Sequence, residues 1–165
     1  MGLFSFLKSR SKQAAVKTEI KYDDPVKALQ AGILFEDSGD LLQWNIPIEQ
    51  SKLYIKKGYR ADRTIYEWGD RIILNGLKLP LLTILWKHKD DGNDVPAIEF
   101  STIKEDAEIY FKMILAHLEK TFGLPKVIEG EPGRLLEWKV GIVKVTLHLF
   151  EQYHTDKLLF QVARI

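Results

Sequence analysis

The amino-acid sequence predicts an α+β domain: an antiparallel or mixed sheet of about five to six strands, a long helix packed on one face, and one or two short N-terminal helices. Three patterns support this fold class. Apolar residues recur at helical spacing from 103 to 122, apolar and polar residues alternate from 135 to 163, and an Asn75-Gly76 pair stands between two apolar segments. These patterns are typical of an amphipathic helix, half-buried strands and a tight hairpin, respectively.

The long helix has the best-defined ends. Thr102 followed by Glu105 matches a capping box, in which each side chain bonds a free backbone amide of the first turn. Gly123 suits the left-handed conformation that ends many helices, and Pro125 prevents continuation. One apolar face results from residues spaced three or four apart: Ile103, Ala107, Tyr110, Phe111, Ile114, Leu115, Leu118 and Phe122.

Short segments rich in β-branched, aromatic and other apolar residues are predicted to be strands. They are 64–68, 71–74, 77–86, 97–100, 135–140, 143–150 and 158–163. The last three are expected to form an antiparallel meander with one face on the core. Pro80 cannot donate to a strand ladder, so it predicts a sheet edge or a bulge in its strand.

A first short helix is expected over 26–31. Asp24-Pro25 suits its start, because aspartate caps free amides and proline fits the first helical position. Gly32 is expected to end it in the left-handed conformation.

A second short helix is expected from about Pro47 to Lys57, capped by Asn45 and ended by Gly58. Its last turn would hold cations, which the helix dipole favours. The same region is a candidate partner-binding surface, since it combines positive charge with aromatic residues. The candidate residues are Trp44, Lys56, Lys57, Tyr59 and Arg60.

Composition indicates a globular protein without disulfides. The chain has 165 residues, of which 45% are hydrophobic and 28% charged, so it can bury a substantial core. It contains no cysteine, which removes disulfides, thiolate metal ligands and cysteine nucleophiles and fits a reducing cytoplasm. No apolar run reaches the roughly 18 residues that a membrane-spanning helix needs. We therefore expect a soluble, cytoplasmic protein.

Charge divides the chain into an arm at 1–22 and a domain at 23–165. Five basic residues and one acidic residue fall within 1–21, so this stretch has a net charge of +4; the total of +1 leaves −3 for the remainder. An acidic domain disfavours nucleic-acid binding. The arm also carries a short apolar stripe: Leu3, Phe4, Phe6 and Leu7. Apolar residues followed by cations are expected either to touch an anionic membrane or to dock on a protein surface.

Three residues near the last hairpin, His148, His154 and Asp156, are weak candidates for catalysis or metal binding. Imidazole and carboxylate groups serve as acids, bases and metal ligands. The alternation nevertheless places His148 beside Lys144 on the polar face of its strand and His154 in a turn. The acidic segment 90–94 lacks the ligand order of a calcium loop. We therefore expect no metal and no cofactor.

No sequence motif identifies the function. The G-x-S-x-G, Walker, G-x-G-x-x-G and H-E-x-x-H patterns are all absent. The leading hypothesis is a non-enzymatic module that binds another protein through an exposed sheet face or through the loops beside Trp44 and Gly58. One alternative is a hydrolase or transferase whose histidines and carboxylates come from dispersed positions. Another is peripheral membrane association through the arm. A homo-oligomer is compatible with each of them.

Overall fold

The structure is a computed structural model that describes residues 24–86, 97–103 and 106–165. The predicted arm at 1–22 and the acidic segment 90–94 lie outside the described residues. The elements in chain order are α1 (Pro25–Ala31), β1 (Gly32–Phe35), β2 (Asp40–Gln43), α2 (Ile48–Ser51), β3 (Lys56–Tyr59), β4 (Arg63–Ile73), β5 (Leu77–Trp86), β6 (Ala97–Ile103), α3 (Asp106–Phe122), β7 (Lys126–Ile128), β8 (Arg134–Val140), β9 (Val143–Gln152) and β10 (Thr155–Arg164).

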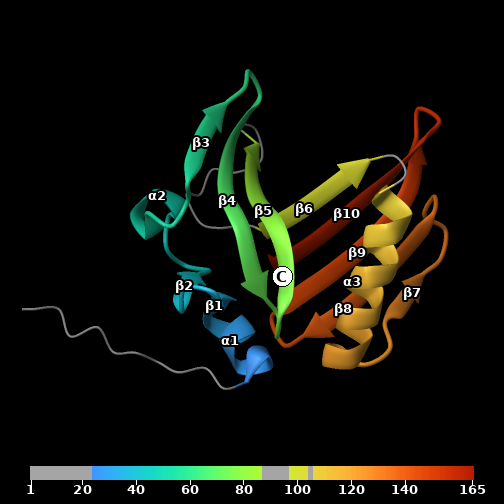
Figure 1. Cartoon of the computed structure of the whole chain (residues 1–165), viewed down its shortest axis with the longest axis horizontal. Helices are drawn as coiled ribbons and strands as arrows, with labels where there is room; N and C mark the ends of the chain where they lie inside the picture. The colour runs from blue at the N-terminus through green and yellow to red at the C-terminus, as the bar shows by residue number, and fades with distance from the viewer. Residues whose placement is uncertain (1–23, 87–96, 104–105) are drawn as a thin grey trace, which may run out of the picture.

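Antiparallel sheet dominates the fold. In the described part of the chain, eight strands form one sheet in the order β3-β4-β5-β6-β10-β9-β8-β7, and β1 and β2 form a separate hairpin. Strands β3 to β5 run at an angle to the group from β6 to β10, and α3 packs on β6, β9 and β10 (Figure 1). The predicted long helix and C-terminal meander are confirmed, but the large sheet has more strands than the five to six expected. No helix among the described residues is long and apolar enough to cross a membrane.

The predicted helix from Pro47 to Lys57 is wrong beyond its first turn. Helix α2 covers only Ile48–Ser51 and ends at Lys52, whose φ of 51° is left-handed. Residues Lys56–Tyr59 instead form β3, with Gly58 inside the strand rather than at a helix end. The long strand β4 supplies hydrogen-bond partners to β3. This tertiary pairing outweighs helix-end signals that are only local.

The start of the long helix also differs from the prediction. Thr102 lies in β6 and pairs with Leu158 of β10, so it does not cap the helix. Because β6 continues its ladder with β10 as far as Ile103, α3 starts later, at Asp106. Asp106 and Glu108 place acidic groups in the first turn, where the helix dipole favours negative charge.

The rest of α3 agrees with the sequence pattern. Gly123 follows its end with a φ of 82°, and its amide donates to the Glu119 carbonyl at 2.9 Å. Four residues of the predicted face are buried: Ala107, Phe111, Ile114 and Leu118. They belong to the same core cluster as the alternating residues of the meander. The largest fully buried side chains of this core are Trp68, Phe35, Phe111, Phe160, Leu29, Ile33, Leu42, Ile48, Ile73, Leu79, Ile98 and Ile114.

The backbone at Gly32 and at the Asn75-Gly76 hairpin differs in detail from the prediction. Gly32 starts β1 instead of ending α1 in the left-handed conformation, and a Cβ there would lie 2.2 Å from the Leu42 carbonyl oxygen. The hairpin at Asn75-Gly76 is confirmed. It is a three-residue turn, because Leu74, Asn75 and Gly76 have φ values of 51°, 67° and 103° and Ile73 pairs with Leu77.

The two strand groups meet at a narrow junction. Strands β5 and β6 share one ladder pair, Leu82 with Glu99. Beside it, the Thr83 hydroxyl donates to the Ala97 carbonyl at 2.7 Å. Pro80 lies outside this pair, where β5 has no ladder partner among the described residues of β6, in agreement with the predicted edge. The bulge lies in the neighbouring strand β4 and not in the strand of Pro80.

Arg71 joins the β1–β2 hairpin to β4. Its guanidinium donates to Asp37 Oδ2 at 3.0 Å, to the Trp68 carbonyl at 2.9 Å and to the Leu53 carbonyl at 3.3 Å. It also lies 4.9 Å from the centroid of the Phe35 ring. One largely buried side chain therefore links three segments of the N-terminal half: the β1–β2 hairpin, the segment after α2, and β4.

Asp37 is expected to make the stability of the protein fall in acid. Partial burial acts to raise the pKa of this carboxyl, but hydrogen bonds from the Ile72 amide and from Arg71 outweigh it and lower the pKa. The ionised form is therefore favoured by folding. The stabilisation is present above the unfolded-state pKa of about 3.9 and is lost as the pH falls through the folded-state value.

Urea unfolding from neutral pH down to about pH 2 measures this effect. We expect Asp37→Asn to lose less stability on acidification than the unmodified protein. Asp156→Asn, which removes an exposed carboxylate from β10, is the matched control. Identical pH dependence for Asp37→Asn and the unmodified protein would contradict the assignment.

Candidate functional site

The histidines of the last hairpin do not converge. His148 lies in β9, with Nε2 2.9 Å from the Pro132 carbonyl oxygen and its ring 4.5 Å from that of Phe150. His154 lies in the turn after Gln152, so the backbone at His148 lies about 13 Å or more along the strand from that turn, at 3.3 Å per residue. The two imidazoles contact different groups, the Pro132 carbonyl and the Glu151 carboxylate.

His154 and Asp156 are both exposed at the tip of the hairpin. His154 Nδ1 lies 3.4 Å from a carboxylate oxygen of Glu151, and Asp156 pairs with Glu151 in the strand ladder. Within the described ranges, no group of three His, Cys, Asp or Glu side chains is arranged to hold a metal ion. The hairpin tip therefore brings together neither metal ligands nor a buried acid–base pair.

Trp44 belongs to the core, which corrects its prediction as a surface contact. Its side chain is 2% exposed, and Nε1 donates to the Leu29 carbonyl at 2.7 Å. The physical reason is that an indole can be buried when its one N–H finds an acceptor, and α1 supplies that acceptor. Trp44 is not part of the surface described next.

The other four partner-binding candidates gather on β3, at the edge of the large sheet (Figure 1). Lys56, Lys57 and Tyr59 lie on this strand, and Arg60 follows it directly. Tyr59 is 70% exposed, and Ile55, just before the strand, is 67% exposed. The surface therefore combines two large apolar side chains with three cations. We call residues 55–60 the β3 edge.

Among the described residues, part of the β3 edge has no strand partner. Arg60 and Arg63 exchange backbone hydrogen bonds of 2.8 and 3.4 Å across the turn to β4. In an antiparallel ladder, hydrogen-bonded pairs alternate with pairs whose amides and carbonyls point outward. Lys57 and Tyr59 fall in the second kind of pair, opposite Tyr66 and Thr64. Their backbone groups therefore point away from β4.

Lys57 occupies a cluster that the sequence patterns did not predict. Its ammonium group bonds a carboxylate oxygen of Glu49, from α2, and the Tyr66 hydroxyl donates to the same oxygen at 3.0 Å. The ammonium also lies 5.0 Å from the ring centroid of Tyr59 and 5.3 Å from that of Tyr66. Tyr54 packs edge-on against Tyr66, with centroids 5.2 Å apart. Aromatic contact thus extends from the core to the exposed strand.

These contacts shift three pKa values in directions that keep the pair charged. The hydrogen bond to Glu49, followed by that to Tyr59, raises the pKa of Lys57. The hydrogen bonds from Lys57 and then Tyr66 lower the pKa of Glu49. Burial, followed by the bond to Glu49, raises the pKa of Tyr66. At neutral pH the cluster therefore contains an ammonium, a carboxylate and a protonated phenol.

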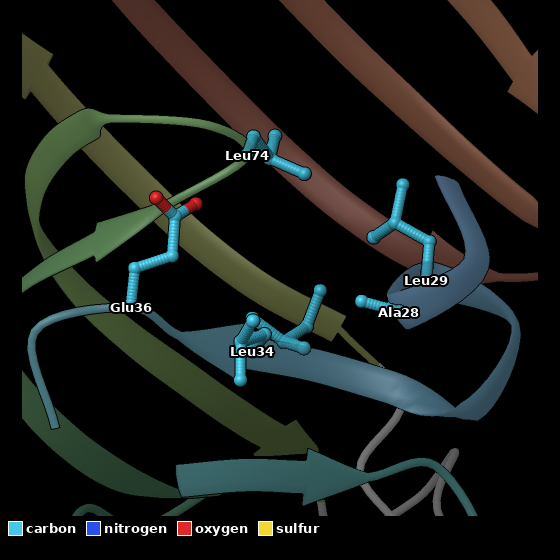
Figure 2. Close-up of a pocket in the computed structure, with 6 residues that line it drawn as sticks. Ala28, Leu29, Leu34, Glu36 and Leu74 are labelled. Atoms are coloured by element: carbon cyan, nitrogen blue, oxygen red, sulfur yellow. The ribbon is translucent and has the colours of Figure 1, made fainter. Parts of the chain in front are cut away.

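Two hollows of the described part of the chain are lined by residues outside this cluster. One small void of about 20 Å³ lies beside α1 and β1, where apolar side chains surround it and Glu36 points toward the turn at Leu74 (Figure 2). It has room for about one water molecule. Its lining residues are Ala28, Leu29, Ile33, Leu34, Glu36 and Leu74.

A larger open hollow of about 480 Å³ lies between the end of α3 and strands β7 and β8. Leu124 at its rim is exposed. The one carboxylate of its lining, Glu137, pairs with Lys144 at 3.2 Å. The hollow therefore presents no unpaired acid to the solvent.

Glu49, Tyr66 and Ile55 were missed for different reasons. In the predicted helix, Glu49 and Lys57 would have been about 12 Å apart along the axis, at 1.5 Å per residue. Only the short α2 and the return of the chain in β3 bring them together. Tyr66 could have been found by pairing residues 56–59 with 64–67 around the Ala61-Asp62 turn. Ile55 carries no distinguishing local signal.

No family model matches the chain, and no curated protein or solved structure is significantly similar to it.

Proposed function

We propose that the protein is a non-enzymatic binding module that receives an extended segment of another protein as an additional strand on β3. The observation that supports this proposal is the open edge itself: β3 is terminal in the sheet, and Lys57 and Tyr59 direct backbone groups outward. An added strand would satisfy these groups through main-chain hydrogen bonds. Its alternate side chains would contact the exposed residues of β3.

The side chains of the β3 edge favour such a partner. Burial of Tyr59 and Ile55, which are mostly exposed in the free chain, would contribute about 1.5–3 kcal/mol for each large apolar side chain that becomes fully covered. The edge carries three cations, and Glu67 and Glu49 pair with two of them, Lys56 and Lys57, in the free chain. A second copy would bring the same cations across from these, and like charges facing each other oppose that pairing. An acidic, extended segment is therefore the occupant that the charge of the edge favours.

Tyr59 is expected to be the main anchor of the added strand. We expect peptides selected on the full-length protein from a random display library to lose about tenfold or more in affinity with Tyr59→Ala, because tyrosine is enriched among the residues that dominate binding energy once a partner covers them. Titration calorimetry measures the affinities. Amide hydrogen exchange should show protection of Lys57 and Tyr59 in the complex.

Tyr153→Ala is the matched control, since Tyr153 is 87% exposed in the turn between β9 and β10. It should leave the affinity unchanged. An equal loss in both variants, selected peptides that leave the Lys57 and Tyr59 amides unprotected, or recovery of no extended peptide would each count against strand addition.

A further inference from the structure

The two side chains of the Glu49–Lys57 pair differ in exposure, and this difference indicates which of them another group could replace. The Lys57 side chain is 21% exposed, whereas that of Glu49 is 59% exposed. Lys57 is held by its strand and flanked by the rings of Tyr59 and Tyr66. An ammonium shielded in this way needs a negative partner more than an exposed carboxylate needs a positive one.

Glu49 lies in a one-turn helix that Ile48 anchors in the core, but the side chain of Glu49 itself is mostly exposed. Helix α2 has four residues, its Pro47 cap makes no side-chain capping bond, and it ends at a left-handed Lys52. A helix of one turn gains little from its backbone hydrogen bonds. An exposed ion pair also adds little stability of its own. The carboxylate of Glu49 is therefore the replaceable member of the cluster.

Lys57 faces the position that the proposed added strand would occupy. Lys57 belongs to the pair whose backbone groups point outward, so a residue of an added strand would sit directly across from it. Cβ atoms of such cross-strand neighbours are about 5 Å apart, which is within reach of an ion pair. A glutamate at that position would extend along the same face as Tyr59.

We propose that Lys57 and Tyr66 form a carboxylate-binding site, which Glu49 occupies in the free protein and which an aspartate or glutamate of the added strand occupies in the complex. This inference rests on the strand addition proposed above. Glu49 acts as an internal competitor: it keeps Lys57 neutralised when the edge is empty, and an incoming carboxylate must displace it. A segment with a carboxylate can bind Lys57 and Tyr66 in its place, whereas a neutral segment cannot, so the edge prefers acidic extended segments.

The test uses two synthetic strand-forming peptides, acetyl-TVTETVT-amide and its glutamine analogue acetyl-TVTQTVT-amide, titrated onto the isotope-labelled full-length protein. Amide shifts of Lys57 and Tyr59 report binding to the edge, and the side-chain carboxyl carbon of Glu49 reports its displacement. We expect the glutamate peptide alone to move the Glu49 signal. With Glu49→Gln, the glutamate peptide should bind about tenfold more tightly, because its competitor is gone.

Control variants separate the two proposals. Glu137→Gln removes the carboxylate that pairs with Lys144 at 3.2 Å in the C-terminal meander, far along the sheet from β3, and should not change the preference between peptides. Lys57→Met should abolish the preference for glutamate, and Tyr66→Phe should reduce it. If both peptides shift the edge amides equally, or if Glu49→Gln leaves the glutamate peptide unaffected, the carboxylate site is overturned while strand addition stands. If neither peptide shifts these amides, both proposals fail.

Discussion

Trp68→Ala is expected to lower the free energy of unfolding by about 3–5 kcal/mol, the range typical of aromatic truncation in a core. Trp68 is fully buried, and its ring lies 5.8 Å from that of Phe35. Its Nε1 donates to the Thr83 hydroxyl at 3.0 Å, and that hydroxyl donates onward to the Ala97 carbonyl. The substitution therefore opens a cavity and removes the donor of a buried relay that crosses β4, β5 and β6.

Urea unfolding followed by far-ultraviolet circular dichroism measures this loss, since the signal does not depend on the deleted indole. Trp68→Phe keeps most of the volume but not the N–H, so it should lose less. Trp86 offers a matched control, because its partly exposed ring lies 4.8 Å from the Arg63 guanidinium near the end of the described strand. Trp86→Ala should lower the free energy of unfolding clearly less than Trp68→Ala does. A comparable loss in the two alanine variants would show that Trp68 is not the central packing residue.

Arg71→Ala is expected to lower the free energy of unfolding by about 2–4 kcal/mol. Its guanidinium bonds Asp37 and two backbone carbonyls, and truncation leaves these acceptors without their largely buried donor. The ring of Phe35 also loses the guanidinium that covers it. The loss should be concentrated where the β1–β2 hairpin meets β4.

Hydrogen exchange can locate the effect of Arg71→Ala as well as measure it. In Arg71→Ala, the exchange rates of amides in β1 and β2 should rise above those of the unmodified protein, whereas the rates in the C-terminal meander should change less. Lys78→Ala is a suitable control, because Lys78 is an exposed cation in the neighbouring strand, and its removal should change stability by less than about 0.5 kcal/mol. If Arg71→Ala is as mild as Lys78→Ala, the side chain does not hold the hairpin in place.

The proposed binding and the stability of the core are separable in this protein. The β3 edge lies at one end of the sheet, whereas α3 packs on β6, β9 and β10 in its other half. Variants of Tyr59 or Glu49 alter exposed groups and should leave the core intact. Binding losses in these variants would therefore report on the edge and not on unfolding.

The local sequence was sufficient to assign secondary structure where an apolar pattern fits only one element that can bury it. The apolar face of α3 and the alternation in β8, β9 and β10 each require cover, and the spacing of apolar residues alone was enough to assign them. The Asn75-Gly76 turn was equally clear, since both residues adopt positive φ readily. These features fix the C-terminal helix-and-meander unit and the central hairpin.

Tertiary contacts decided the remainder, and the candidate site depends on them. Residues 56–59 carry the lysines and glycine expected at the end of a helix. They nevertheless form an edge strand, because they pair with β4 through a ladder of backbone hydrogen bonds. That change brought Glu49 to Lys57 and turned the backbone of Tyr59 outward. The sequence by itself determined which segments must be buried. Only the folded structure decided which strand remains at the edge, because strand order depends on pairing between distant segments.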